Sequence, residues 1–113
     1  MNNKTVQAIE ENIRQAKLIA GKGEALERLR QNRDFKAVIL DGYFKEEAIR
    51  LVHLKADPSM QSPDMQKSII AQMDAIGSLN QYFTAVVQQG SIALKAISAD
   101  EETRDEILAE ENN

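Results

Sequence analysis

The sequence predicts an all-α protein: a helical hairpin or small bundle with one long, coiled-coil-like C-terminal helix and an extra N-terminal helix. Apolar residues recur at steps of three and four along almost the whole chain, which is the spacing of one helix face. Aromatic residues make up only 4% of the 113 residues and tryptophan is absent, so the expected core is mainly aliphatic. Such a core favours the packing of helices over a strand-rich fold, and a chain of this length forms one domain at most.

The first predicted element is an amphipathic N-terminal arm, residues 1–31. The Gly21-Lys22-Gly23 segment is expected to end or bend its helix, because glycine is a poor helix former. Residues Glu24 to Gln31 are then expected to form a further short helix. Five apolar residues mark the buried face of the arm: Val6, Ile9, Ile13, Ala16 and Ala20.

The second predicted element opens a helical hairpin core, residues 32–99. Its helix is expected to begin after Asn32 or Asp34, since either side chain accepts a hydrogen bond from a backbone N–H at a helix N-terminus. Gly42 is interpreted either as a kink or as a close contact between helices, and both alternatives stay open. The Asp57-Pro58 pair ends the helix, because a proline disfavours helical geometry in the residue before it.

Ser62-Pro63-Asp64 marks the start of the long third helix, which is expected to run to about Ile97. Serine caps a helix, proline suits its first position, and an acid in the first turn complements the helix dipole. The apolar seam of this helix keeps a heptad-like register, with Asn80 and Gly90 as its exceptions. The candidate protein interface consists of eight seam residues: Ile69, Met73, Ile76, Asn80, Phe83, Val87, Leu94 and Ile97.

This seam has two interpretations. It is either an interface for a partner helix or the inner side of an intramolecular hairpin with residues 35–56, and the periodicity alone suits both. The five aromatic residues also lie at helical spacing, so they are interpreted as core residues rather than as the walls of a ligand pocket.

The C-terminal residues 100–113 form an acidic tail. Seven acids stand against the single Arg104, so the tail has a charge of −6 within a chain whose net charge is −4. Ser98 or Asp100 is expected to cap a final short helix, which frays unless a partner receives Ile107 and Leu108. These two residues are the candidate tail contact.

The sequence offers no combination of residues that supports catalysis. Cysteine is absent, which excludes disulfides, thiolate metal sites and cysteine nucleophiles. His53 is the only histidine and lies among apolar residues, and the GKGE stretch at 21–24 lacks the spacing of a phosphate-binding loop. We therefore expect a protein that is not an enzyme and that uses no cofactor or metal.

Charge and hydropathy indicate the class of partner. Arg28, Arg30 and Arg33 form the only basic cluster and are diluted by nearby acids, so a solvated surface is favoured over nucleic-acid binding. No apolar run is long enough for a membrane span, and the N-terminus lacks the apolar stretch of a signal peptide, so a soluble protein is expected. The expected partners are protein subunits, in a homo-oligomer or on a larger protein.

A family resemblance narrows the setting. The segment DFKAVILDGYFKEEAIRLVHLKADPSMQ, followed by IIAQMDAIGSLNQYF and the acidic C-terminus, resembles a type of small helical protein found in the genomes of tailed bacteriophages. The resemblance covers roughly residues 24–111 and contains no motif for a reaction. It implies a virion-associated or assembly role, in the virion or the host cytoplasm.

Two hypotheses of function follow. The first is a structural or assembly protein of a phage particle that oligomerises or docks on a larger virion protein through its helices. The alternative is a small regulatory binding protein, such as a phage inhibitor of a host protein, that uses the acidic tail. A nucleic-acid packaging subunit ranks below both, because it needs a basic recognition helix.

Overall fold

The computed structural model describes residues 2–112, and every element in that range is helical. This confirms the all-α prediction with one long C-terminal helix and an extra N-terminal helix. In chain order the elements are α1 (Asn2–Arg30), α2 (Arg33–Phe35), the π-helix η1 (Lys36–Glu47), α3 (Ala48–Ala56), the 3₁₀-helix η2 (Pro58–Met60) and α4 (Pro63–Glu111).

The helices group into two compact units. Unit 1 combines Met1–Leu26 with Ala85–Asn113, and unit 2 consists of Glu27–Thr84. The helix α4 contributes its C-terminal half to unit 1 and its N-terminal half to unit 2, and each unit has an apolar core of its own.

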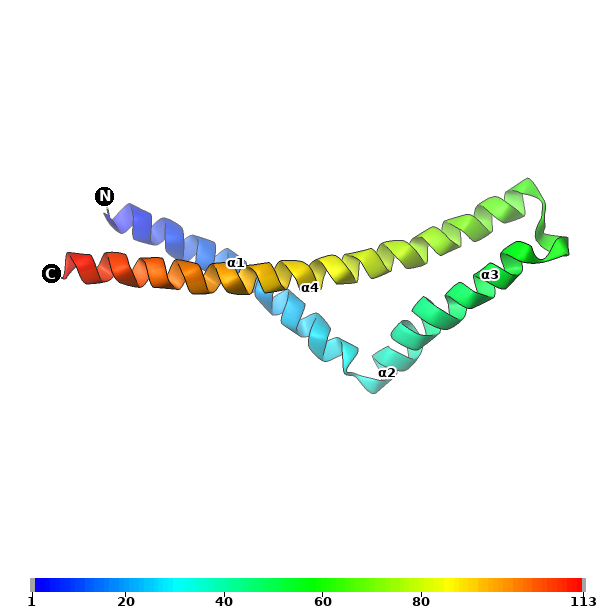
Figure 1. Cartoon of the computed structure of the whole chain (residues 1–113), viewed down its shortest axis with the longest axis horizontal. Coiled ribbons are helices and arrows are strands. Elements are labelled where there is room, and N and C mark those ends of the chain that lie inside the picture. The colour runs from blue at the N-terminus through cyan, green and yellow to red at the C-terminus, as the bar shows by residue number, and fades with distance from the viewer. Residues whose placement is uncertain (1, 113) are drawn as a thin grey trace. The chain divides into compact units, whose positions relative to one another are not determined.

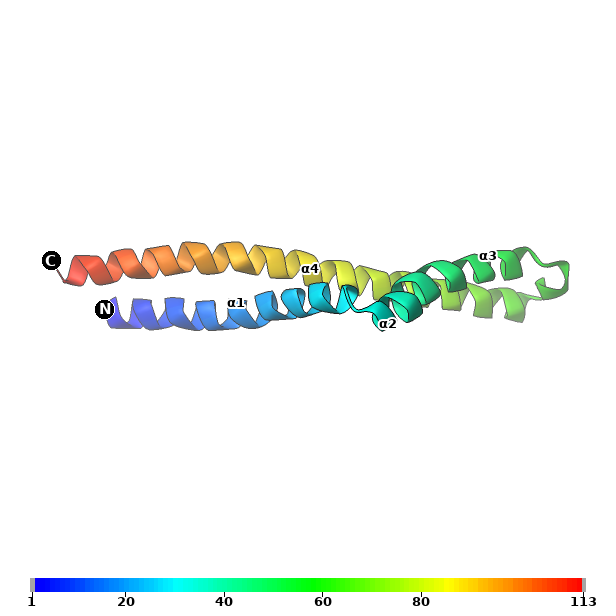
Figure 2. The ribbon, with the colours of Figure 1, turned by 90° about the horizontal axis from the view of Figure 1, so that it is seen from below.

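Unit 1 is an antiparallel pair of helices, α1 and the C-terminal half of α4 (Figure 2). Its α1 side is the face predicted from the periodicity of the N-terminal arm. The helix pair is held by a cluster in which four residues are buried and two more are partly buried against them. These are Ile13, Ala20, Ala93 and Ile97, with Ile9 and Ala16 beside them.

The two helices of unit 1 approach closely at a pair of glycines, Gly23 and Gly90. A Cβ atom added to Gly23 would lie 3.1 Å from the Cα of Gly90 and 3.3 Å from the carbonyl oxygen of Val86. Because the helices are antiparallel, a step of three residues from each glycine brings the small side chains of Ala20 and Ala93 into the same cluster. The absence of side chains at the glycines therefore sets how closely the backbones pack.

The expectation that α1 ends near Gly21 and Gly23 is wrong. The helix is unbroken from Asn2 to Arg30, so no separate helix forms over residues 24–31. A glycine in a helix interior costs about 1 kcal/mol relative to alanine. At Gly23 the close contact with α4 offsets that cost, whereas nothing lies within 4 Å of a Cβ added at Gly21.

Within unit 2 a new helix begins at Asn32, one of the two predicted start positions. Its side chain accepts a hydrogen bond from the backbone N–H of Phe35 at 2.9 Å. The chain then continues through α2, η1 and α3 alongside the N-terminal half of α4 (Figure 1). Leu51 is fully buried between them, with Ile69 and Ile76 of α4 in the same cluster. This half of the predicted long-helix seam therefore packs against α3 and η1, as the intramolecular interpretation expects.

The helix η1 is a π-helix of 12 residues, a feature that the sequence analysis did not anticipate. A π-helix is wider than an α-helix, because its hydrogen bonds run between residues five apart, and runs of this kind are rare. A Cβ added at Gly42 would lie 3.0 Å from the carbonyl oxygen of Ala37, five residues earlier in the same helix. The close neighbour of Gly42 is thus its own helix rather than another one.

The connection from α3 to α4 follows the predicted signals. The helix α3 ends at Ala56, and the Asp57 carboxylate accepts a hydrogen bond from the backbone N–H of Ser59 at 2.8 Å. At the start of α4 the Ser62 hydroxyl oxygen accepts from the backbone N–H of Met65 at 3.3 Å. The predicted helix end at Asp57-Pro58 and the predicted cap at Ser62 are confirmed, while the capping of η2 by Asp57 was not predicted. Each of the two side chains supplies an acceptor to a backbone donor that has no partner within its helix.

The far end of α4 differs from the prediction. The helix continues to Glu111, so no separate final helix begins at Ser98 or Asp100. Half-buried Ile107 lies on the same stripe as buried Ile97, and a helix that packs along a partner is more stable than an isolated short one. Among the described residues no helix is long and apolar enough to cross a membrane.

Candidate functional site

The structure buries part of the predicted interface inside the chain. Of the eight candidates, Ile69, Ile76 and Ile97 are buried in the cores of the two units. The next three, Met73, Phe83 and Val87, are half-buried, while Asn80 and Leu94 are exposed. The buried members pack against α1, η1 and α3 of their own chain, as the intramolecular interpretation of the seam expects.

After Ile76 one flank of the buried stripe of α4 is shifted from the prediction, while Phe83, Gly90 and Ile97 keep the predicted register. On the shifted flank the more buried positions are Leu79, Val86 and Ala93, each one residue before the predicted Asn80, Val87 and Leu94. A helix of 3.6 residues per turn drifts against a strict heptad, so one flank can rotate out of a long seam. The small side chain of Ala93 suits the close approach of α1, and the larger Leu94 faces outward with 48% of its surface exposed.

An apolar flank is left on the outside of α4. Val87, Leu94 and Leu108 lie at multiples of seven residues, so they share one side of the helix. Leu94 and Leu108 are exposed by 48% and 38%, and Val87 is half-buried. We call these three residues the α4 flank. It contains one candidate from the predicted tail contact, Leu108, whereas Ile107 turns toward the seam and is half-buried.

All five aromatic side chains of the protein contact one another in unit 2. Phe83 is the centre of the group, with its ring 6.0 Å from that of Phe35 and 5.6 Å from that of Phe44. Tyr43 lies 5.8 Å from Phe44, and Tyr82 lies 6.3 Å from Phe83. Ring centroids at 4.5–7 Å in tilted or edge-on arrangements are favourable. Four of the five rings are half-buried in this group, as the core interpretation expects, whereas Tyr82 is exposed by 54%. The contact between Phe44 and Phe83 fastens the π-helix to α4.

A hollow of about 480 Å³ lies beside this aromatic group in unit 2. Its apolar wall comes from Leu40 and Phe44 of η1 and from Ile76 of α4. Gly77 opens it further, since a Cβ added there would meet nothing within 4 Å. We call this feature the basic hollow, because the other residues at its edge are Arg30, Lys45 and Asn80.

The two cations of the basic hollow are only loosely paired. Arg30 lies 3.7 Å from Glu27 and Lys45 lies 3.6 Å from Asp41, each through a single contact between exposed side chains of one helix. Exposed ion pairs of this kind contribute about 0–1 kcal/mol and are readily exchanged. Arg30 and Lys45 can therefore donate hydrogen bonds to an anionic group that enters the hollow.

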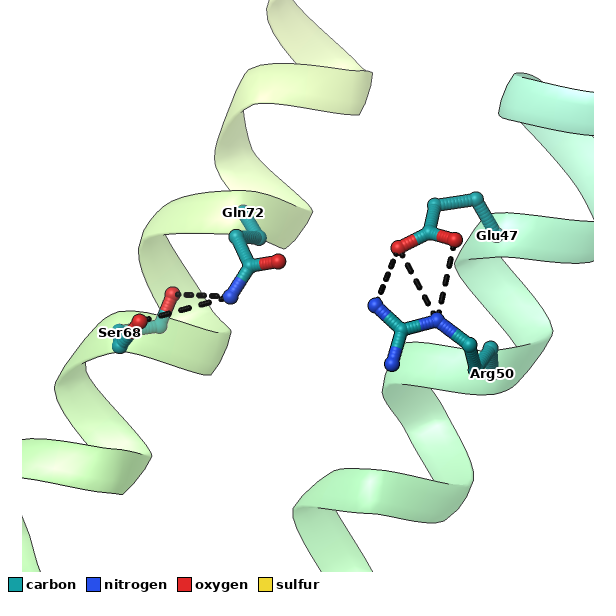
Figure 3. Close-up of polar contacts among 4 residues, drawn as sticks. All are labelled: Glu47, Arg50, Ser68 and Gln72. Atoms are coloured by element: carbon teal, nitrogen blue, oxygen red, sulfur yellow. Dashed lines mark hydrogen bonds and ion pairs between the residues drawn. The ribbon is translucent and has the colours of Figure 1, made fainter.

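A second hollow, of about 350 Å³, opens on another part of the π-helix. It is lined by Val38, Ile39, Gly42, Tyr43 and Glu47. Two hollows thus use residues of η1, and π-helical segments are frequent at functional sites. The acid at its edge, Glu47, accepts a hydrogen bond from Arg50 Nε at 3.0 Å, which lowers the pKa of the Glu47 carboxyl (Figure 3).

Figure 3 also shows how the polar side chains on the facing helices are used. Glu47 pairs with Arg50 in the η1–α3 segment, and the Gln72 amide donates to the carbonyl and hydroxyl oxygens of Ser68 on α4 at 3.3 and 3.4 Å. Both pairs lie within a single helix. These contacts stabilise each helix surface locally, while apolar side chains hold the helices together.

The described residues contain no group of three or more His, Cys, Asp or Glu side chains that could hold a metal ion. His53 is exposed in the last turn of α3. Comparisons of the chain with models of protein families, with curated proteins and with solved structures found no match.

The basic hollow was not predictable from the sequence. Arg30 belongs to the cluster that was interpreted as a solvated surface, and Lys45 lies 15 residues further along the chain. Arg30 and Lys45 are brought together only because both line the same hollow between helices. The local periodicity of the sequence contains no signal for such a hollow. The α4 flank was detectable, because Leu94 and Val87 already stood in the predicted seam.

Proposed function

We propose that the protein is a non-enzymatic structural or assembly protein that binds protein subunits through helix faces lying outside its two internal cores. The observation that supports this most is the number of apolar side chains left in solvent. Within residues 2–112, twelve large hydrophobic side chains are exposed, among them Leu18, Val38, Ile49, Ile92 and Leu94. Scattered exposed apolar residues are common, but so many in a small chain are typical of a protein that meets partners.

The surface area supports the same proposal. The chain exposes 8259 Å², whereas a globular monomer of 12.6 kDa exposes about 6,200 Å². Specific interfaces bury about 1,200–2,000 Å² in total, so the excess is large enough for one or more of them. Each unit contains a single layer of paired helices, and the outer faces of those helices are free to pack against another chain.

The α4 flank is the surface that we assign to this contact first. Val87 and Leu94 lie seven residues apart and Leu108 lies fourteen residues further on, with Glu101 at the position between, and apolar residues in such a register pack against another helix. Leu94 is the most exposed of the three. In the setting that the phage resemblance implies, the protein would oligomerise or dock on a larger virion protein, in the virion or in the host cytoplasm.

The test is the solution mass of the protein by light scattering over a range of concentrations, with a variant of the flank. The Leu94→Glu variant introduces a charge at a position exposed by 48%, so the monomer stays folded while association weakens. Gln89→Glu, at an exposed polar position of the same helix, is the matched control. We expect an oligomer for the wild type and the control and a lower mass for Leu94→Glu. A wild type that stays monomeric at every concentration would contradict the proposal.

The alternative function is a small regulatory protein that binds its target through the acidic tail. The observation in its favour is that Glu102, Asp105, Glu106, Glu110 and Glu111 are exposed along one helical segment. Removing the whole tail would also remove Ile107 from the seam, so the sharper test replaces the exposed acids by their amides. Loss of target binding with an unchanged oligomer mass would favour the regulatory function over the structural one.

A further inference from the structure

We propose that the basic hollow receives the acidic C-terminal segment of a second copy of this chain, with Leu108 inserted between Arg30 and Lys45. The inference rests on the proposed function, since it names the contact by which subunits join. It brings together a hollow in unit 2 and a segment of unit 1, from different copies.

The hollow has the size and chemistry for an apolar side chain between acids. Its volume of about 480 Å³ exceeds the space that one leucine side chain needs, and its wall is formed by Leu40, Phe44 and Ile76. Arg30 and Lys45 stand at its edge with only one loose contact each. An arginine has five N–H donors and a lysine has three, so most of their donors remain for an incoming carboxylate.

The C-terminal segment has the complementary pattern. Leu108 is exposed by 38%, and the acids three residues before and after it, Asp105 and Glu111, are exposed as well. Residues three apart in a helix are neighbours on its surface, so the three side chains form one stripe: acid, leucine, acid. Arg104 contacts Asp105 at 3.2 Å and is the only base in the tail, so Glu111 is the unpaired acid of the stripe while the tail as a whole keeps a charge of −6.

Charge complementarity selects this occupant over an apolar partner. An interface in which cations meet acids gains specificity and a faster association rate, and the buried leucine supplies the apolar contact. Because the hollow and the acidic stripe are different surfaces of one chain, the contact is heterologous. Heterologous contacts close into rings or continue as filaments, which suits an assembly protein.

The experiment is a charge exchange between the two surfaces in the full-length protein. One variant carries Arg30→Glu with Lys45→Glu, and the other carries Asp105→Lys with Glu111→Lys. Association is measured by sedimentation and light scattering at low and moderate salt, and folding is checked by circular dichroism. We expect each variant alone to associate at least about tenfold more weakly than the wild type, and an equimolar mixture of the two to associate again.

The matched control is Arg28→Glu with Arg33→Glu, which makes the same change of net charge at exposed positions outside the hollow. It is expected to leave association within about twofold of the wild type, because screened surface charges act weakly at a distance. Recovery of association in the mixture would show that the two surfaces contact each other. A variant with a damaged fold would not regain association when the other variant is added.

The outcomes separate this inference from the proposed function. Two results would overturn the inference and leave the proposed function standing, provided that the wild type forms an oligomer. In the first, the hollow variant and its control lose association equally. In the second, the mixture of the two charge-exchange variants fails to associate. If the wild type is monomeric and a labelled peptide of residues 98–113 does not bind it, both are overturned. If the peptide binds to a monomeric wild type, the second copy is excluded as the occupant.

Discussion

Glycine has opposite effects at two positions of the same helix. Gly23 lies where α1 meets α4, with the Cα of Gly90 only 3.1 Å from the place of a Cβ atom. Gly21 lies two residues earlier, and an added Cβ there would meet nothing within 4 Å. Glycine therefore permits close packing of the two helices at position 23, whereas at position 21 it only weakens the helix.

We predict that Gly23→Ala and Gly90→Ala each destabilise the protein, whereas Gly21→Ala stabilises it. Overpacking of a close contact costs about 1–3 kcal/mol, because the backbones on both sides must move apart. An alanine at a free helical position gains about 0.5–1 kcal/mol over glycine. The free energy of unfolding from urea titrations gives the sign and size for each variant. Equal effects at positions 21 and 23 would contradict the assigned contact.

At the scale of elements, the helices carry ion pairs between residues three apart. Arg14 donates from Nε to Glu11 Oε2 at 2.9 Å, and the Gln15 amide donates to the same carboxylate at 3.1 Å. The hydrogen bonds from Arg14, and then from Gln15, lower the pKa of Glu11 from its ordinary 4.5 to about 2. The pair is exposed, so it supports the first half of α1 mainly in its charged form and is weakened by salt.

We predict that this pair makes α1 sensitive to acid. Since the pKa of Glu11 is lower in the folded chain, the unfolded chain binds the proton first as the pH falls below about 4.5. The stabilisation is complete above that pH and is lost as the pH falls toward about 2. Glu11→Gln should reduce the loss of helicity over this window, measured by circular dichroism, relative to Glu10→Gln. An identical acid titration for both variants would show that the pair contributes nothing.

The π-helix η1 is the element that separates this chain from a plain helical hairpin. Its 12 residues supply walls to both hollows, and the contact between Phe44 and Phe83 holds it against α4. Extra width in one helix turns side chains away from the positions that an α-helix would give them. Here that change accompanies a space large enough for a partner's side chain.

At the scale of the whole molecule, each of the two cores is small. The buried hydrophobic residues include two alanines, and Leu51 is the largest fully buried side chain among the described residues. Two-helix units with modest cores have little stability to spare, and small domains often gain it by association. Oligomer formation would then support the fold as well as the function.

We predict that the melting temperature rises with protein concentration. A contact made by the native chain and not by the unfolded one stabilises the native state in proportion to the logarithm of the partner's concentration. Calorimetric or dichroism scans over a hundredfold range of concentration measure this directly. In Leu94→Glu the dependence should flatten, while Gln89→Glu should retain it. A melting temperature that is constant for the wild type would contradict self-association in that range.

Much of the fold was predictable from local patterns. The caps at Asn32 and Ser62 and the helix end at Asp57-Pro58 were predicted, because a side-chain acceptor or a proline beside an apolar periodic segment is a local signal. The buried face of α1 at Ile13 and Ala20 followed from spacing alone. The break expected at Gly21–Gly23 was wrong, since propensity takes no account of Gly90, which lies far away in sequence.

The candidate site was predictable only in part. The seam of α4 was recognised, but its register after Ile76 and the exposure of Leu94 depend on how closely α1 approaches. The basic hollow needs Arg30, Lys45 and Gly77 around one space, and these residues belong to three separate helices. Their proximity is a property of packing, for which a single sequence has no local pattern.

The sequence by itself determined the helical class, the acidic C-terminus, and the starts of two helical segments, the one after Asn32 and the one after Ser62. Each of these features depends on neighbours within a few residues. Only the tertiary structure decided that α4 divides its seam between two cores, that η1 is a π-helix, and that apolar residues at the α4 flank remain outside. The reason is physical: contact distance between helices depends on side chains from both partners, and these lie far apart along the chain.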